Sequence, residues 1–443
     1  MAKQKDVSPA RRTAFDILRR VADGAFSSVL LAAEEPKLSI SDRALTHELV
    51  LGVVRRQLWL DKIIEHFSRR SVESLDLPVR IALRLGLYQL RFLSRIPASA
   101  AVNESVNLVR SAKLSSAAAF VNAVLRRAIR EADYDPSADA QDTLEKLAIE
   151  TSHPVWLIDR WTKAFGAAEA ELLARANNEI PPTAFRVVHR RANEDEVIKQ
   201  LTAAGALIER SYVAADAFRV SGATATLREL TANGEIYLQD EASQLVAHML
   251  FALPGQRVLD LCAAPGGKTT LIADRALDKA FIIAADRSAA RLTTIRTTAA
   301  LHQLRSITAT LLDAAEKLPF ATESFDRILV DAPCSGTGTL RRNPEIRWRL
   351  AATDIPSFAA SQKHFLRNAA DVLKPGGRLV YSTCSVEREE NEDVVADFLS
   401  THPDFALEKT LRTWPHREGS DGFFLAILVD TRSENARGIS RDR

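Results

Sequence analysis

Two of the three cysteines in this 443-residue chain follow short apolar runs that are typical of buried parallel strands. Cys334 ends the run Ile328-Leu-Val-Asp-Ala-Pro-Cys334, and Cys384 ends Arg378-Leu-Val-Tyr-Ser-Thr-Cys384. The 50 residues between them leave room for one helix joining two neighbouring strands. In an open α/β sheet, chemistry collects at the carboxyl ends of the strands. Two thiols there predict nucleophilic catalysis, and the alternative is a pair of inert core thiols.

A glycine-containing loop between a predicted strand and a predicted helix indicates a nucleotide site. Two glycines allow close backbone approach, and the following helix start offers free N–H groups. A phosphate-binding P-loop would need glycine where Cys262 stands, and the G-x-G-x-x-G dinucleotide pattern is absent. The remaining interpretation is an S-adenosylmethionine site whose loop holds the methionine part. Its candidate residues are Cys262, Ala263, Ala264, Pro265, Gly266, Gly267 and Lys268.

Acidic residues at the ends of the next predicted strands favour S-adenosylmethionine. Asp286 ends the second strand, where a carboxylate can accept both ribose hydroxyls, and Asp313 follows the third, near the adenine end. Asp331 ends the fourth strand, close to both the cofactor and Cys334. A helix N-cap explains any one of these acids better than a ligand contact does. As a set they indicate a cofactor site, in which Lys268 could orient a carboxylate or cover the helix end.

Composition limits the class of protein. The chain is 46% apolar and 26% charged, as expected of a soluble protein with two or three domains. It has no apolar run of about 18 residues, and its first residues lack an apolar signal core, so we expect a cytoplasmic protein without a membrane span. Three cysteines without a CxxC pair predict reduced thiols and no metal site.

Charge is unevenly distributed along the chain. Residues 1–130 hold 22 Lys and Arg against 12 Asp and Glu, whereas the remainder holds 37 against 45. A basic module joined to a slightly acidic one indicates a polyanion-binding domain beside a catalytic domain. A solvated charged face is the simpler alternative.

The pattern of apolar residues predicts a multidomain protein. Helical spacing over 8–131 predicts an all-α domain. The polar stretch over 132–150 predicts a linker. The alternating helices and strands after it predict a small α+β module followed by an α/β domain. The last residues have almost no apolar content and predict disorder. The predicted boundaries are 1–135 for the helical domain, 150–235 for the middle module, 236–431 for the α/β domain and 432–443 for the disordered tail.

Three motifs now resemble those of RNA cytosine-5 methyltransferases. They are DLCAAPGGKT at 260–269, LVDAPCSGTG at 329–338 and YSTCSVEREENEDVV at 381–395. The N-terminal 130 residues are similar to the NusB fold, a helical RNA-binding module. The order of NusB-like domain, middle module and Rossmann-like methyltransferase domain resembles bacterial enzymes that methylate one cytosine of 16S ribosomal RNA. This resemblance covers residues 8–430.

The resemblance implies a mechanism with distinct roles for the two thiols. Cytosine C5 becomes nucleophilic when a thiolate adds to C6, and in this family the Thr-Cys thiol adds while the Pro-Cys thiol assists release. Carried over, Cys384 is the nucleophile, Cys334 the helper, and Asp331 the group that holds the cytosine edge. The implied cofactor is S-adenosylmethionine, the partner is small-subunit ribosomal RNA, and we expect a monomer. The alternatives are 5-methylcytosine formation in transfer RNA or large-subunit ribosomal RNA, a methyltransferase acting on an exocyclic nitrogen, and a mainly non-catalytic assembly factor.

Two charged segments beside the motifs have open interpretations. Arg341–Arg349 interleaves arginines with Trp348, which suits single-stranded RNA equally as well as a structural segment with Trp348 in a core. For the acidic stretch Glu387–Asp397, helix capping is the preferred interpretation.

Overall fold

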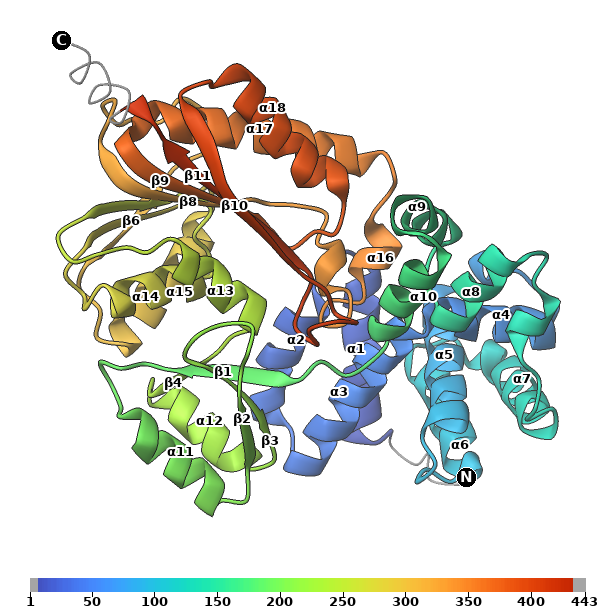
Figure 1. Cartoon of the computed structure of the whole chain (residues 1–443). Helices are drawn as coiled ribbons and strands as arrows, with labels where there is room; N and C mark the ends of the chain where they lie inside the picture. The colour runs from blue at the N-terminus through green and yellow to red at the C-terminus, as the bar shows by residue number, and fades with distance from the viewer. Residues whose placement is uncertain (1–6, 433–443) are drawn as a thin grey trace, which may run out of the picture. The chain divides into compact units, whose positions relative to one another are not determined.

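The computed structural model describes residues 7–432 (Figure 1). Apart from Arg432, the predicted tail of 432–443 lies outside the described residues. The chain forms two compact units: unit 1 comprises the chain up to Ile180 together with Leu340–Leu350, and unit 2 comprises Pro181–Thr339 and the chain from Ala351 onward. The predicted boundaries near residues 135, 150 and 235 stay predictions. Within residues 7–432, each helix is too short or too polar to serve as a membrane span.

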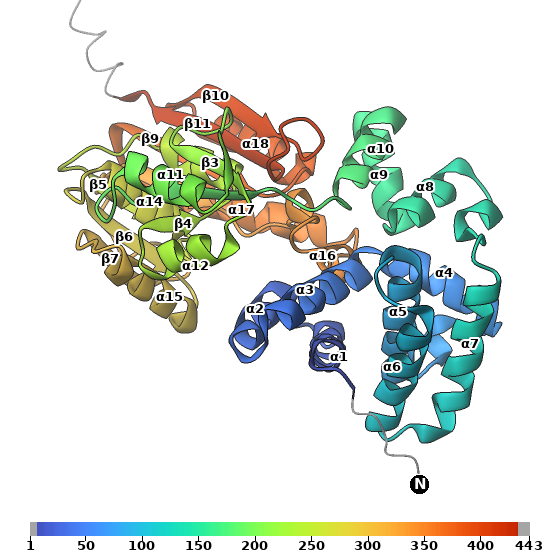
Figure 2. The same cartoon turned by 90° about the horizontal axis from the view of Figure 1, so that it is seen from below.

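Unit 1 is all helical over its described residues, as predicted for 8–131 (Figure 2), and an apolar core joins α1 to α7. Proline in the first turn of α1 and α5 suits positions where no backbone N–H bond is lost. The stripe Ile81, Leu85 and Tyr88 is buried, as its spacing indicates. The main helices are α1 (Pro9–Ala22), α2 (Ser27–Glu34), α3 (Ile40–Arg55), α4 (Gln57–Ser68), α5 (Leu77–Phe92), α6 (Ala98–Ser111), α7 (Ala118–Arg130), α8 (Thr143–Thr151), α9 (Val155–Phe165) and α10 (Ala167–Ala176), with α16 (Ile346–Arg349) contributed by the later segment.

The stretch 132–150, which is predicted to be a linker, lies within unit 1 and contains most of α8. Asp142 accepts a hydrogen bond from the backbone N–H of Glu145 and so caps α8. The buried faces of Ala148 and Ile149 show why this polar stretch forms a helix. Its few apolar residues lie on one side, and α8 packs against α4 and α9.

Unit 2 begins with the predicted α+β module. Its four strands form an antiparallel sheet in the order β2-β3-β1-β4. The apolar residues of β1 and β3 pack against helices α11 and α12. The elements are β1 (Thr183–Val187), α11 (Glu194–Ala203), β2 (Leu207–Arg210), β3 (Ala217–Ser221), α12 (Thr224–Ala232) and β4 (Ile236–Leu238). The short strands β2 and β4 are not among the predicted elements.

The remainder of unit 2 is the predicted α/β domain, with a seven-stranded mixed sheet in the order β10-β11-β9-β8-β5-β6-β7. Helices α17 and α18 cover one face and α13, α14 and α15 the other (Figure 1). The strands are β5 (Arg257–Asp260), β6 (Phe281–Asp286), β7 (Ile307–Leu311), β8 (Phe325–Asp331), β9 (Leu373–Thr383), β10 (Phe405–Thr413) and β11 (Phe423–Asp430). The helices are α13 (Glu241–Met249), α14 (Gly267–Arg275), α15 (Ala289–Leu301), α17 (Asp354–Val372) and α18 (Glu392–Thr401).

The strand order places a topological switch beside β5. The chain runs from β5 through β6 to β7 on one side and then returns to β8 on the other side of β5. Strands β5 to β9 are parallel, so their carboxyl ends meet at one edge of the sheet. Ligands of open α/β sheets bind at such a switch point.

A glycine in unit 1 gives a packing prediction. A Cβ at Gly86 would lie 2.7 Å from Leu125 Cδ1 and 2.8 Å from Ser105 Oγ. Gly86→Ala should therefore destabilise unit 1 by about 1–2 kcal/mol, because overpacking outweighs the better helix propensity of alanine. Urea denaturation followed by circular dichroism measures the change. Adding Leu125→Ala removes the close contact with Leu125 and leaves the one with Ser105, so the double variant should lose less stability than the sum of the single variants. Equal or higher stability for Gly86→Ala would contradict the packing.

Candidate active site

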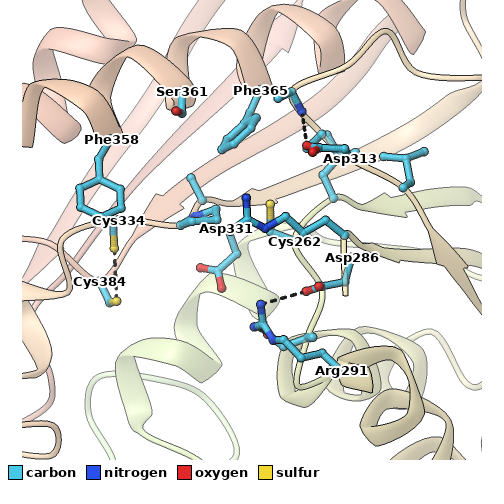
Figure 3. A pocket seen from close by; sticks show the side chains of 18 residues that line it. Cys262, Asp286, Arg291, Asp313, Asp331, Cys334, Phe358, Ser361, Phe365 and Cys384 are labelled. Carbon is cyan, nitrogen blue, oxygen red and sulfur yellow. Dashed lines mark hydrogen bonds and ion pairs between the residues drawn. The ribbon is translucent and has the colours of Figure 1, made fainter. Parts of the chain in front are cut away.

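The two strand-end thiols meet in unit 2. Cys334 lies three residues beyond the end of β8, and Cys384 directly follows β9. The strands are paired so that Asp331 lies opposite Ser382. Cys334 Sγ and Cys384 Sγ are 3.4 Å apart and form a hydrogen bond (Figure 3). Both thiols are partly exposed, and both line the same cavity.

The two thiols are electrostatically different. The hydrogen bond to Cys384, burial and nearby negative charge raise the pKa of Cys334 well above its ordinary value. Cys334 therefore keeps its proton at neutral pH and can donate it toward Cys384 Sγ. Cys262, the third thiol, also lines the cavity, and burial raises the pKa of its thiol. A high pKa makes Cys262 a poor nucleophile.

Asp331 lies at the centre of a polar cluster beside the thiols. Its Oδ2 accepts a hydrogen bond of 2.7 Å from Lys268 Nζ, and its Oδ1 accepts one of 2.8 Å from Ser382 Oγ. Burial opposes the charge of Lys268, but the adjacent Asp331 carboxylate outweighs this effect and raises the pKa of the ammonium. Lys268 thus orients a carboxylate, the first of its two predicted roles. Each Asp331 oxygen retains a lone pair for a further donor.

The loop between β5 and α14 is shaped by its glycines. Gly266 has a φ of +105°, which an L side chain rarely adopts, and a Cβ there would lie 3.3 Å from Ile295. Gly267 is the first residue of α14, so its backbone N–H is among those left without a partner inside the helix. Thr269 Oγ1 donates to Asp260 Oδ2 at 2.7 Å and ties the helix to the end of β5.

The acids at the ends of β6 and β7 line the cavity as predicted. Asp286 accepts a hydrogen bond from Ser288 N and forms an ion pair of 3.2 Å with Arg291 (Figure 3). Arg291 also donates to Ala264 O at 2.6 Å, which fixes the loop after β5 against the end of β6. Asp313 accepts from Ala315 N and so forms an Asx-turn after β7.

One cavity of about 380 Å³ brings together most of the predicted site. The predicted residues that line it are Cys262, Ala264, Asp286, Asp313, Asp331, Cys334 and Cys384. The other predicted residues, Ala263, Pro265, Gly266, Gly267 and Lys268, shape the loop or hold Asp331 without lining the cavity. Residues 7–432 contain no group of three or more His, Cys, Asp or Glu placed to hold a metal ion.

Helix α17 supplies a wall of the cavity that sequence reasoning missed. Phe358, Ser361 and Phe365 line it and point from the helix toward the strand ends (Figure 3). Their spacing places all three on one face of a helix, a pattern that a helix packed on a core shares. Two aromatic rings beside the strand ends provide an apolar surface for a base.

The cavity has the chemistry that S-adenosylmethionine requires. Asp286 offers carboxylate oxygens for hydroxyl donors, and Leu312 and Phe365 offer apolar surface for a purine. Asp260 Oδ1 is buried and has no hydrogen-bond partner among the described residues. An unpaired buried acceptor is energetically costly. A donor such as the amino group of the methionine part would satisfy it.

Comparisons with known proteins agree with this chemistry. Residues 247–429 match the family described as 16S rRNA methyltransferase RsmB/F, residues 8–130 match the NusB family, and residues 153–226 match the ferredoxin-like domain of RsmF/B-like methyltransferases. The chain is 37% identical over 425 residues to the probable ribosomal RNA small subunit methyltransferase B of Bacillus subtilis, covering 91% of this chain and 94% of that one. It is 37% identical over 415 residues to the corresponding Pseudomonas putida protein, covering 90% and 93%. The crystal structure of PH0851 superposes with a TM-score of 0.84 at 28% identity, covering 96% and 99%.

The environment of Asp260 gives a pH prediction. Burial raises the pKa of Asp260 to about 7, above its ordinary value of 3.8. The folded state thus holds this proton more tightly than the unfolded state, so the stability of the ligand-free protein falls as pH rises from the ordinary value of 3.8 to about 7 and levels off above that. Asp260→Asn removes this ionisation. Between about pH 5 and pH 7, the melting temperature of unit 2 should then fall by a few degrees less in this variant than in the wild type. Asp371→Asn, at an exposed position of α17, is the control and should follow the wild type. An unchanged pH slope in Asp260→Asn would contradict the assignment.

Proposed function

This chain belongs to the RsmB/F family of 16S rRNA methyltransferases, and we propose that it methylates C5 of a cytosine in small-subunit ribosomal RNA. The methyl donor in this proposal is S-adenosylmethionine. The observation that carries the proposal is the pair of thiols 3.4 Å apart beside Asp331 in one cavity. Methylation of an exocyclic nitrogen needs no thiol, whereas methylation of C5 needs a nucleophile at C6.

The reaction divides one hard step into easier ones. The Cys384 thiolate forms a bond to C6, which pushes electron density onto C5. When bound, S-adenosylmethionine supplies an electrophilic methyl group, and C5 takes that methyl from the sulfonium sulfur. A base then removes the C5 proton, the electron pair restores the C5–C6 double bond, and the bond between C6 and Cys384 breaks.

Cys334 is assigned the supporting role. Its raised pKa keeps it protonated, and its S–H lies within hydrogen-bond distance of the sulfur that must leave C6. A donated hydrogen bond stabilises the departing thiolate and so favours release of the product. This division agrees with the roles expected from the motifs.

The remaining site residues hold the two ligands. The Asp331 carboxylate, fixed by Lys268 and Ser382, accepts a hydrogen bond from the N4 amino group of the cytosine. Asp286 accepts from the ribose hydroxyls and Asp313 lies toward the adenine. The loop from Cys262 to Lys268 surrounds the methionine part.

The helical unit is the proposed site of RNA docking. Its first 130 residues carry ten more positive than negative charges, and they match the NusB family. Phosphate contacts from such a surface supply affinity that falls with salt. The target cytosine must lie in a single strand or leave its stack to reach Cys384. Another RNA substrate would use the same site chemistry, and a mainly non-catalytic assembly factor has no use for two adjacent thiols.

The nucleophile assignment predicts a complete loss of activity for one cysteine variant. Cys384→Ala should abolish methyl transfer to small-subunit ribosomal RNA, because the neighbouring thiol, Cys334, keeps its proton and is not expected to add to C6. Binding of S-adenosylmethionine should persist, since this side chain is not needed to hold the cofactor. Transfer of labelled methyl groups, with mapping of 5-methylcytosine in the product, measures the first effect, and calorimetry measures the second. Activity near the wild-type level would refute the assignment.

The helper assignment predicts a trapped intermediate. Cys334→Ala should accumulate a covalent adduct between protein and RNA, because addition proceeds while release is slowed. A band of reduced mobility on a denaturing gel reports the adduct. The Cys334→Ala/Cys384→Ala double variant is the control and should form none. Normal turnover without an adduct in Cys334→Ala would exclude a role in release.

A further inference from the structure

The same residue type follows both thiols. Ser335 follows Cys334, and Ser385 follows Cys384. Both serine side chains are buried, and their hydroxyl oxygens lie 3.0 Å apart. Neither hydroxyl is needed for the chemistry described above, so their shared position calls for another explanation.

Both serines form hydrogen bonds to the same buried carboxylate. Glu390 is fully buried, in the short helical turn Arg388–Glu390 before α18. Its Oε1 accepts a hydrogen bond of 2.8 Å from the backbone N–H of Ser335. Its Oε2 accepts from Ser335 Oγ and, at 2.5 Å, from Ser385 Oγ. One side chain thus binds the residue after each thiol.

The third element of this cluster is helix α17. Gln362 Nε2 donates to Glu390 Oε1 at 3.1 Å and to Pro333 O at 3.0 Å. The backbone of Glu390 is held as well, because Tyr381 Oη donates to its carbonyl oxygen at 2.5 Å. The carboxylate therefore joins the loop after β8, the loop after β9 and α17.

We propose that Glu390 is a positioning residue that holds Cys334 and Cys384 in register for the reaction. This inference rests on the proposed function for its catalytic consequence, although the geometric part concerns the protein alone. Glu390 touches neither thiol and acts only through the residues that follow them. The expectation that this acidic stretch serves helix capping is wrong for Glu390, whose side chain is turned into the core.

The position requires a carboxylate rather than any residue of similar shape. Each oxygen accepts two hydrogen bonds, and all four partners can act as donors. Glutamine keeps the shape but has one acceptor oxygen. Its NH₂ group would face either the two N–H donors, which it cannot satisfy, or the two serine hydroxyls, which would have to act as acceptors and lose the bonds that they now donate to Glu390. Either arrangement weakens the link between the two loops, so we expect them to move apart. Aspartate is one methylene shorter and could not reach both loops.

Burial raises the pKa of Glu390, whereas the bonds from Ser335 and Ser385 oppose that rise. These donors therefore favour the charged form of Glu390, which is the form that binds both loops. Glu390 also contributes to the raised pKa of Cys334, after the hydrogen bond from Cys384 and burial. If Glu390 lost its charge, the pKa of the Cys334 thiol would fall toward its ordinary value.

The geometric part is tested without RNA or cofactor, on the full-length protein. Phenylarsine oxide reacts with two thiols, forms two As–S bonds and releases water, and it needs both sulfurs within close reach. Wild-type protein should form a bridged adduct linking Cys334 and Cys384, identified by mass spectrometry of the peptides. Glu390→Gln should lower the apparent affinity for the arsenical by roughly tenfold or more, because the misplaced loops separate the sulfurs. Glu392→Gln, two residues away at an exposed ion pair with Arg412, is the matched control and should bind like the wild type.

The catalytic part is tested by steady-state kinetics on the same variants. Glu390→Gln should lower kcat roughly a hundredfold while the KM values for RNA and for S-adenosylmethionine stay within about twofold, as expected when reacting groups are misplaced by about 1 Å. If Glu390→Gln does not fold, the Ser335→Ala/Ser385→Ala double variant removes the two hydroxyl bonds to Glu390 and leaves the bond from the backbone N–H of position 335, so it should show both effects in weaker form.

The outcomes separate this inference from the proposed function. Wild-type arsenical affinity in Glu390→Gln, or a rise in KM at unchanged kcat, would overturn the positioning role. Suppose that Glu390→Gln weakens the arsenical bridge while the wild-type protein transfers no methyl group to ribosomal RNA. That result would support the positioning role of Glu390 and refute the proposed methylation of ribosomal RNA.

Discussion

The pairing of β8 with β9 is the constraint on which the site depends. Neighbouring strands lie about 4.8 Å apart, so residues just beyond their ends can touch only if the register is correct. Asp331 opposite Ser382 places both loops at the same height, and the thiols 50 residues apart in sequence come to 3.4 Å. A slip of one residue would turn the alternate side chains to the opposite face of the sheet. The hydrogen bond from Ser382 Oγ to Asp331 runs across this register and reinforces it.

The site residues at the strand ends could be predicted, because the ends of buried parallel strands can be recognised in the sequence. Buried parallel strands appear as short apolar runs, and the polar residue that follows each run marks the sheet edge. This logic located Asp286, Asp313, Asp331 and both thiols around one cavity. It could not find Phe358 or Phe365, because an aromatic residue on an amphipathic helix has the same pattern whether it faces a core or a cavity. The strands β2 and β4 were missed for a related reason, since three or four residues are too few to show a period.

The sequence alone could not decide whether the segment Arg341–Arg349 binds RNA or has a structural role. The structure favours the structural interpretation, in which these side chains serve unit 1. Arg347 is fully buried and donates to Ser152 O at 3.1 Å and Asn177 O at 3.2 Å, which are carbonyl groups near helix ends. Trp348 packs against the core of unit 1 and donates to Val54 O. Arginine satisfies helix carbonyls with the same guanidinium that binds phosphate, so composition alone cannot distinguish the two uses.

The division of labour proposed for the thiols is supported by their surroundings rather than by their depth. Both follow parallel strands, and both are partly exposed, so position leaves them equivalent. The hydrogen bond between them breaks this equivalence, because one sulfur must donate and the other accept. The raised pKa of Cys334 makes it the donor and Cys384 the acceptor of this bond. This asymmetry supports the proposal that Cys384 attacks C6 and Cys334 assists release. In the proposed reaction, the S–H group of Cys334 would stabilise the Cys384 thiolate as it leaves C6, so this one contact would favour release of the product.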